Sequence, residues 1–143
     1  MGANSSAKSS TPCCLIVRSY ELDAYGHVNH ANFLNYFEQA RVEFLEQRDL
    51  SFSSLWDEGY AFVIVRAEVD YRQPLFMSDE MEIHTEIIGI GNTSVTLSQR
   101  IIKNPGNALI SMGRFVAVFL DKLSRQPVRV PDRFRKEFHC PSR

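Results

Sequence analysis

Residues 22–41 read LDAYGHVNHANFLNYFEQAR, a stretch that passes from a polar segment into an apolar helical pattern. Asp, Gly and Asn within residues 23–29 are typical of a turn or loop, and Asn29 is a suitable helix N-cap. From His30 onward, apolar residues recur at the spacing of one helical face, which predicts a helix that ends at residues 51–54. The residues of this face are Phe33, Leu34, Phe37, Ala40, Phe44 and Leu45.

The segments on either side of this helix have the composition of β-strands. Residues 14–22 are apolar and β-branched, which predicts a first strand before the loop. After the helix, segments of strand length are separated by Gly, Asn and Pro turns, which is typical of an antiparallel meander. One apolar helix that must be covered by one sheet predicts an α+β fold. The later strands are expected at residues 60–72, 80–90, 93–102 and 108–120, with a short helix at 132–138.

Length and composition predict a single soluble domain. The chain has 143 residues, a common size for one domain. Lys and Arg together number 16 and Asp and Glu 17, so the chain has no large basic field for binding nucleic acid. The longest apolar runs, such as residues 115–120, are much shorter than the roughly 20 residues of a membrane helix. We therefore expect neither a nucleic-acid partner nor a membrane partner.

The N-terminal residues 1–12 are rich in Ser and have no apolar stretch, so we expect a flexible tail before a single domain at 13–143. Gly2 and the residues after it fit the short pattern for N-myristoylation, although so few letters also occur in unmodified chains. Cys13 and Cys14 are adjacent and the total of three Cys is odd, which argues against a disulfide framework. Reduced thiols of this kind indicate a cytoplasmic protein.

The loop before the helix carries ionisable side chains beside a helix N-terminus. Asp23 supplies a carboxylate, and His27 and His30 supply imidazoles. The first N–H groups of a helix have no partner within it and carry partial positive charge, so they suit the oxyanion of an attacked carbonyl. A carboxylate at this place is able to attack a carbonyl carbon or to deprotonate water for that attack. The same residues also fit a plain capped turn, and the pattern alone leaves both interpretations open.

His27 and His30 also have the spacing of two metal ligands on a helix. No third ligand follows them at a known spacing, and His27 precedes the predicted helix. We therefore expect neither a metal nor any other cofactor.

Residues 23–29, 31–34 and 37–41 together resemble the signature of the hot-dog acyl-CoA thioesterases, in particular the 4-hydroxybenzoyl-CoA thioesterase and YbgC-like family. Residues 70–75, 79–80 and 127–131 also match the layout of that family. The resemblance thus extends over nearly all of the chain after the N-terminal tail. It implies a hot-dog fold, in which a five-stranded antiparallel sheet is wrapped around a long central helix.

The resemblance also implies an activity and an assembly. An acyl-CoA substrate would be hydrolysed to a free acid and CoA, within a homodimer or homotetramer whose active site lies at the subunit interface. Asp23 falls on the catalytic carboxylate of the family, which acts as nucleophile or as general base for water. The backbone N–H near His30 falls where the family polarises the thioester carbonyl. Many relatives have Asn or a bulky residue at the position of His30. This difference in side chain leaves the backbone N–H donor intact.

The resemblance places the substrate-binding positions on the same loop and helix. Tyr25, Gly26, His27 and Asn29 would shape the loop or bind the acyl side, and Phe33 would line the acyl pocket. The neighbouring aromatic residues Tyr36, Phe37 and Phe44 are expected to pack around the helix as core. Basic residues on the strands are candidates for the CoA phosphates, or else solvated surface: Arg66, Arg72, Arg100, Lys103 and Lys122.

Two other functions fit the same fold. A non-catalytic acyl-CoA-binding domain, used as a sensor or scaffold, would not need a carboxylate in the loop, so Asp23 favours the enzyme. A dehydratase or hydratase of the hot-dog type would need a His with a Glu or Asp in a different strand and helix context, which the sequence does not contain. Aromatic, short-chain and longer acyl groups all fit the motif, whether carried by CoA or by acyl carrier protein.

Overall fold

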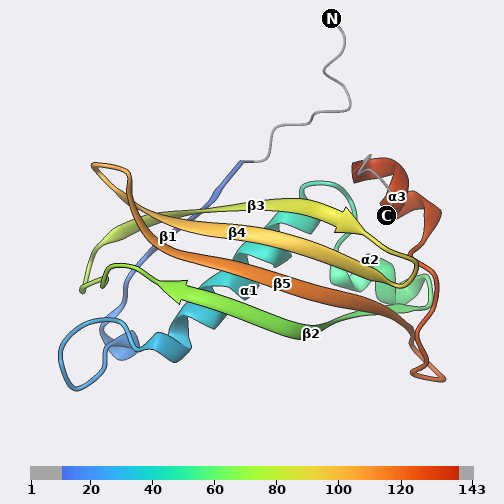
Figure 1. Cartoon of the computed structure of the whole chain (residues 1–143), viewed down its shortest axis with the longest axis horizontal. Coiled ribbons are helices and arrows are strands. Elements are labelled where there is room, and N and C mark those ends of the chain that lie inside the picture. The colour runs from blue at the N-terminus through green and yellow to red at the C-terminus, as the bar shows by residue number, and fades with distance from the viewer. Residues whose placement is uncertain (1–10, 139–143) are drawn as a thin grey trace, which may run out of the picture.

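Within residues 11–138, which are the residues that the structure describes, the chain forms one curled antiparallel sheet around one long helix. In this computed structural model α1 (His30–Glu46) lies across the inner face of the sheet, and the predicted α+β hot-dog architecture is confirmed (Figure 1). The strands are β1 (Cys13–Ile16), β2 (Tyr60–Tyr71), β3 (Glu80–Ile90), β4 (Ser94–Asn104) and β5 (Ala108–Asp121). Their order across the sheet is β1-β3-β4-β5-β2, and every neighbouring pair is antiparallel.

The first strand is shorter than the sequence predicts. Residues 14–22 were expected to be extended, but β1 ends at Ile16 and the 3-10 turn η2 (Ser19–Glu21) follows. The carboxylate of Glu21 accepts the backbone N–H of Arg18 at 2.9 Å, which closes this turn. Because a buried carboxylate must accept hydrogen bonds, the turn forms here even though the neighbouring residues favour a β-strand.

The C-terminal end of α1 also differs from the prediction. The helix ends at Glu46. A second helix, α2 (Phe52–Asp57), follows it, and between the two helices the backbone at Asp49 has a positive φ of 58°. Ser51 is the N-cap of α2, because its hydroxyl oxygen accepts the N–H of Ser54 at 3.1 Å. Residues 51–54 thus begin a helix instead of ending one.

The N-terminal prediction falls mostly outside the described residues, as does the myristoylation pattern at Gly2. Of the expected tail, Thr11 is described, and its N–H and carbonyl exchange hydrogen bonds with the Gln47 side chain at 3.2 and 3.0 Å. Cys13 is buried and Cys14 is exposed, and both are free thiols.

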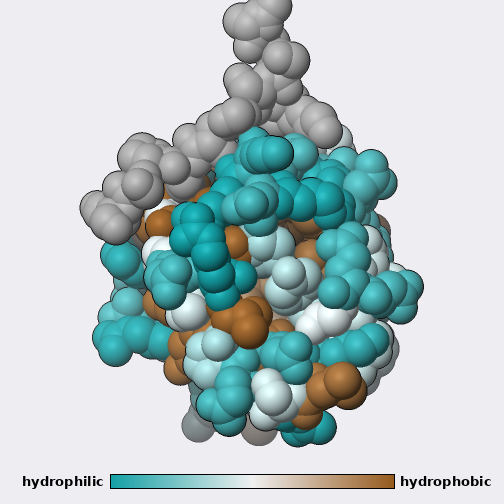
Figure 2. Space-filling view, turned by 90° about the vertical axis from the view of Figure 1, so that its right-hand side faces the viewer, coloured by the Kyte–Doolittle hydropathy of each residue, from teal (hydrophilic) through white to brown (hydrophobic). Residues whose placement is uncertain are grey.

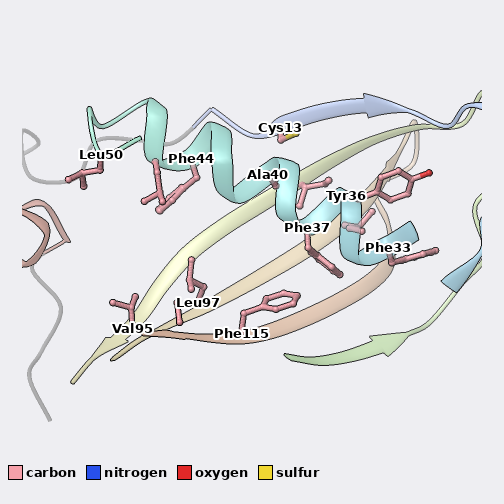
Figure 3. Close-up of a cluster of buried hydrophobic side chains, with 14 of the residues drawn as sticks. Cys13, Phe33, Tyr36, Phe37, Ala40, Phe44, Leu50, Val95, Leu97 and Phe115 are labelled. Atoms are coloured by element: carbon pink, nitrogen blue, oxygen red, sulfur yellow. The ribbon is translucent and has the colours of Figure 1, made fainter. Parts of the chain in front are cut away.

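The core lies between α1 and the inner face of the sheet. Tyr36, Phe37 and Phe44 are buried, as predicted, and Phe33 is buried beside them. Figure 3 shows Phe37 directed from α1 toward Phe115 on β5, and their ring centroids are 5.2 Å apart. At the end farthest from residues 23–29, α3 (Asp132–Phe138) closes the core, and the surface there is mainly hydrophilic with scattered apolar side chains (Figures 1 and 2).

Glu21 fastens the segment before the helix to the helix itself. Its carboxylate accepts hydrogen bonds from the Tyr36 hydroxyl at 2.7 Å and from Arg18 Nε at 2.9 Å. Its backbone carbonyl accepts the Asn29 N–H at 2.9 Å and the Asn32 side-chain amide at 3.0 Å. These four bonds hold both ends of residues 22–29, so the loop leaves and rejoins the fold at defined positions.

We expect this carboxylate to make stability depend on pH. Burial alone raises the pKa of Glu21, but hydrogen bonds from the Arg18 N–H, the Tyr36 hydroxyl and the Arg18 guanidinium outweigh it and lower the pKa below its ordinary value. Such a carboxyl stabilises the fold above the pKa of the unfolded chain, and the contribution is lost as pH falls through the folded-state pKa. The stability advantage of wild type over Glu21→Gln should therefore shrink from about pH 6 to about pH 3. Urea denaturation across this range measures it, and a constant difference would contradict the assignment.

Candidate active site

The loop of residues 23–29 is a small closed turn. The Asp23 N–H donates to the His27 carbonyl at 2.8 Å, and the Gly26 N–H donates to the Asp23 carbonyl at 3.1 Å. Gly26 has a φ of 86°, a left-handed conformation that residues with a Cβ adopt only at a cost. On either side, Leu22 bridges to Val28 and His27 bridges to Phe76. The backbone therefore sets the direction of the Asp23 side chain.

The Asp23 carboxylate is held at both oxygens. Oδ1 accepts the backbone N–H of Tyr25 at 2.8 Å, and Oδ2 lies 3.3 Å from Nδ1 of His27. The side chain still retains 23% of its exposure, so the carboxylate is accessible as well as oriented. An oriented and accessible carboxylate can reach a bound molecule without first changing its rotamer.

The N-terminus of α1 lies next to this loop. Asn29 is the N-cap, as predicted, because its side chain accepts the Ala31 N–H at 2.9 Å, while its carbonyl accepts the Asn32 N–H at 2.9 Å. For the N–H of His30, no hydrogen-bond acceptor is found among residues 11–138. This N–H belongs to the positive end of a helix of 17 residues, which is the kind of donor that stabilises an oxyanion.

A pocket of about 320 Å³ joins the loop, the helix start and the end of β2. Tyr71, the last residue of β2, donates its hydroxyl to the His30 carbonyl at 3.1 Å and packs edge-on against Phe33, with centroids 5.1 Å apart. The segment after β2 thus lines the pocket together with the loop, to which it is joined by the hydrogen bond from the Val28 N–H to the Leu75 carbonyl at 2.8 Å. The lining residues are Asp23, His27, Val28, His30, Phe33, Tyr71, Arg72, Gln73 and Pro74.

The structure brings together four of the seven site residues that the sequence suggests. Asp23, His27, His30 and Phe33 line the pocket. The other three build its surroundings: Gly26 supplies the turn, Asn29 caps the helix, and Tyr25 stands 85% exposed with its ring stacked 6.2 Å from that of His27.

Sequence reasoning missed the contribution of Tyr71, Gln73 and Pro74 to the pocket. Residues 70–75 stood out only as a segment that matches a family layout. Nothing in their spacing indicates that the end of β2 lies against the start of α1, since 41 residues separate His30 from Tyr71. That contact depends on β2 crossing back along the helix.

The basic residues considered for CoA phosphates are scattered. Arg72 lines the pocket. Arg66 pairs with Glu68 at 3.1 Å, and Lys103 pairs with Asp79 at 3.4 Å. Lys122 lies over the ring of Trp56 at 5.2 Å, and Arg100 is exposed on β4. Of the five, Arg72 is therefore the one at the pocket.

Neither a metal cluster nor a membrane helix is found in residues 11–138. No three side chains from His, Cys, Asp and Glu gather there as metal ligands would. Likewise, none of the helices in this part of the chain has the length and apolar character needed to cross a membrane.

Comparison with known proteins identifies the family. The profile of the thioesterase-like superfamily matches residues 17–138. The acyl-CoA thioester hydrolase YbgC of Escherichia coli O157:H7 is 36% identical over 124 residues, covering 85% of this chain and 92% of YbgC. The long-chain acyl-CoA thioesterase FadM of Escherichia coli K12 is 31% identical over 121 residues, covering 85% and 91%. A solved structure of a hypothetical protein from Aquifex aeolicus has a TM-score of 0.83 at 26% identity, covering 90% of this chain and 98% of that one. This chain therefore belongs to the thioesterase-like superfamily.

Proposed function

We propose that this protein is an acyl-CoA thioesterase that hydrolyses an acyl-CoA to a free acid and CoA. The observation that carries the proposal is the pocket itself, which is lined both by Asp23, with its oriented carboxylate, and by His30, the N-terminal residue of α1. The names of YbgC and FadM, which describe hydrolysis of acyl-CoA thioesters, support the same activity.

The chemistry follows from these two groups. The thioester carbonyl oxygen would lie toward the His30 N–H, whose dipole stabilises the negative charge that develops on attack. Asp23 then acts on the carbonyl carbon, either directly as nucleophile or through a water that it deprotonates. Expulsion of the sulfur from the tetrahedral intermediate releases CoA. On the water route this step also yields the free acid, whereas on the direct route the acyl group is left on Asp23 as a mixed anhydride, which water hydrolyses to the acid.

The remaining walls suggest how the substrate lies. Phe33, Val28 and Pro74 give the pocket an apolar side, which suits the acyl group. Arg72 gives it one cationic side chain, which suits a CoA phosphate. We therefore place the acyl group toward Phe33 and the CoA toward Arg72.

Release of free thiol from a panel of aromatic, short-chain and long-chain acyl-CoAs tests the activity, with Asp23→Asn measured beside wild type. Turnover of at least one ester by wild type is the expected result. Tight binding of acyl-CoA without turnover would instead identify a sensor or scaffold. Addition of water to an enoyl-CoA would identify a hydratase.

We also propose that two chains pair through β2. This strand is an edge of the sheet, 12 residues long, and exposes Val63 and Val65 at 36% and 60%. A long edge with exposed apolar side chains is a template for pairing with another strand. Sedimentation equilibrium should give the mass of at least two chains, and Val65→Lys should shift the protein toward the single-chain mass. A wild-type protein with the mass of one chain would refute the pairing.

A further inference from the structure

The imidazole of His27 is fixed beside the Asp23 carboxylate by several independent contacts. Its Nδ1 lies 3.3 Å from Asp23 Oδ2. The ring of Tyr25 stacks on it at 6.2 Å, and the ring of Phe76 meets it edge-on at 6.2 Å. The His27 backbone is bridged to Phe76 as well. With these neighbours the ring presents its Nδ1 to Asp23.

This orientation leaves one ring nitrogen for a ligand. Nδ1 faces the carboxylate, so Nε2, on the other side of the ring, is the remaining proton-carrying atom. Within the described part of the chain no hydrogen-bond partner of Nε2 is found, and His27 lines the pocket. A carboxylate on Nδ1 with a free Nε2 is the arrangement by which enzymes prepare a histidine for proton transfer.

The proposed reaction creates a need for such a group. Breaking the carbon–sulfur bond leaves negative charge on sulfur, and a proton delivered at that moment lowers the barrier. The other polar residues of the pocket suit this task less. Arg72 does not give up its proton, Gln73 is not an acid, and the Tyr71 hydroxyl already donates to the His30 carbonyl. The ring of His30 is exposed and meets the edge of the Tyr71 ring at 6.2 Å, and no carboxylate of residues 11–138 pairs with it.

We propose that His27 is the general acid that protonates the leaving sulfur of the substrate. The assignment rests on the proposed thioesterase function. When water attacks the carbonyl carbon, one water proton passes to Asp23 and the hydroxyl group forms the new carbon–oxygen bond. The carbon–sulfur bond then breaks with its electron pair on sulfur, which takes the Nε2 proton of His27. Nδ1 keeps its proton on the side of Asp23 throughout, so Nε2 is restored by way of water: solvent takes the proton from Asp23 and gives one to Nε2. Thioester and water thus yield acid and thiol, and both groups return to their starting state.

Two substitutions separate proton transfer from positioning. His27→Asn places an amide near Nδ1, where it still donates to Asp23, but has no atom at Nε2. His27→Gln places an amide near Nε2, where it donates a hydrogen bond but gives up no proton. Each variant is assayed with an acyl-CoA and with a 4-nitrothiophenyl thioester of the same acyl group, whose thiolate leaves without a proton. His84→Asn is the matched control, because His84 pairs with Glu82 at 3.0 Å on β3 and does not line the pocket.

Both His27 variants are expected to lower kcat for the acyl-CoA about 100-fold and to stay within about 3-fold of wild type for the nitrothiophenyl ester. His84→Asn should match wild type on both substrates. Equal losses on both substrates would overturn the proposal and leave His27 as a positioning residue. Wild-type rates for His27→Asn on the acyl-CoA would overturn it too. If the proposed function itself is wrong, the pattern differs, since wild type and all variants then leave both esters intact.

Discussion

Replacement of Asp23 by Asn is expected to lower kcat for acyl-CoA hydrolysis by about 1,000-fold or more, because it removes the anion that attacks the carbonyl carbon or activates the water. The amide oxygen of Asn still accepts the Tyr25 N–H that now bonds to Oδ1 at 2.8 Å. The turn should therefore persist, and the free energy of unfolding should change by less than about 1 kcal/mol. Thiol-release kinetics and urea denaturation of the same preparation measure both quantities.

The chain offers a matched control for this substitution. Asp121 also accepts backbone N–H groups two and three residues ahead, those of Leu123 at 3.0 Å and Ser124 at 2.8 Å. It lies at the end of β5, at the opposite end of the molecule from residues 23–29 (Figure 1). Asp121→Asn should therefore keep the wild-type rate. If Asp23→Asn keeps more than about a tenth of the wild-type rate, the carboxylate is not the reacting group.

The largest effect on stability is expected at Gln99, which joins α1 to the sheet inside the core. The Gln99 side chain is fully buried on β4, and its Oε1 accepts a hydrogen bond from the Arg41 guanidinium at 2.9 Å. Its Nε2 donates to the Phe37 carbonyl at 3.1 Å and to the Thr85 hydroxyl at 2.9 Å. One amide thus satisfies polar groups from the helix and from the neighbouring strand β3.

Arg41 depends on this amide because little water reaches it. Its side chain is 6% exposed, its guanidinium lies 4.5 Å from the centre of the Phe115 ring, and Glu38 accepts its other hydrogen bond at 2.7 Å. Burial lowers the pKa of the Arg41 guanidinium even though Glu38 acts in the opposite direction. Loss of the Gln99 oxygen would leave a buried cation with part of its donors unsatisfied.

Gln99→Leu is therefore expected to lower the free energy of unfolding by about 3 kcal/mol, with a fall in Tm of about 8 °C. Urea and thermal denaturation measure these changes. Gln126→Leu, at an exposed position after β5, is the control and should stay within about 0.5 kcal/mol of wild type.

The double variant Arg41→Leu with Gln99→Leu tests the cause. In the double variant the Arg41 cation is absent, so the Leu at position 99 no longer leaves a buried charge without a hydrogen-bond acceptor. The double variant should therefore lose at least about 1 kcal/mol less than the sum of the two single variants. Strict additivity would show that the two side chains act independently and would contradict the link.

Much of the fold and part of the site were predictable from local patterns. The start of α1 at His30 and the cap at Asn29 follow from a polar loop that meets an apolar helical spacing, and the structure has both. The later strands were placed to within a few residues, since alternation and turn residues are local signals. The first strand was too long in the prediction because the turn that ends it depends on the buried Glu21. Glu21 accepts the nearby Arg18 N–H but also the hydroxyl of Tyr36, which is 15 residues away in the chain.

The sequence by itself determined that Asp23, His27 and His30 lie on one short segment at a helix N-terminus, because their spacing in the chain limits how far apart they can lie. Only the tertiary structure decided that Tyr71 and Arg72 line the same pocket and that Gln99 accepts a hydrogen bond from Arg41 across the core. Those neighbours are brought together by strand order and by the curl of the sheet over α1. Contacts of this kind depend on the packing of whole elements, which no spacing of residues within one segment records.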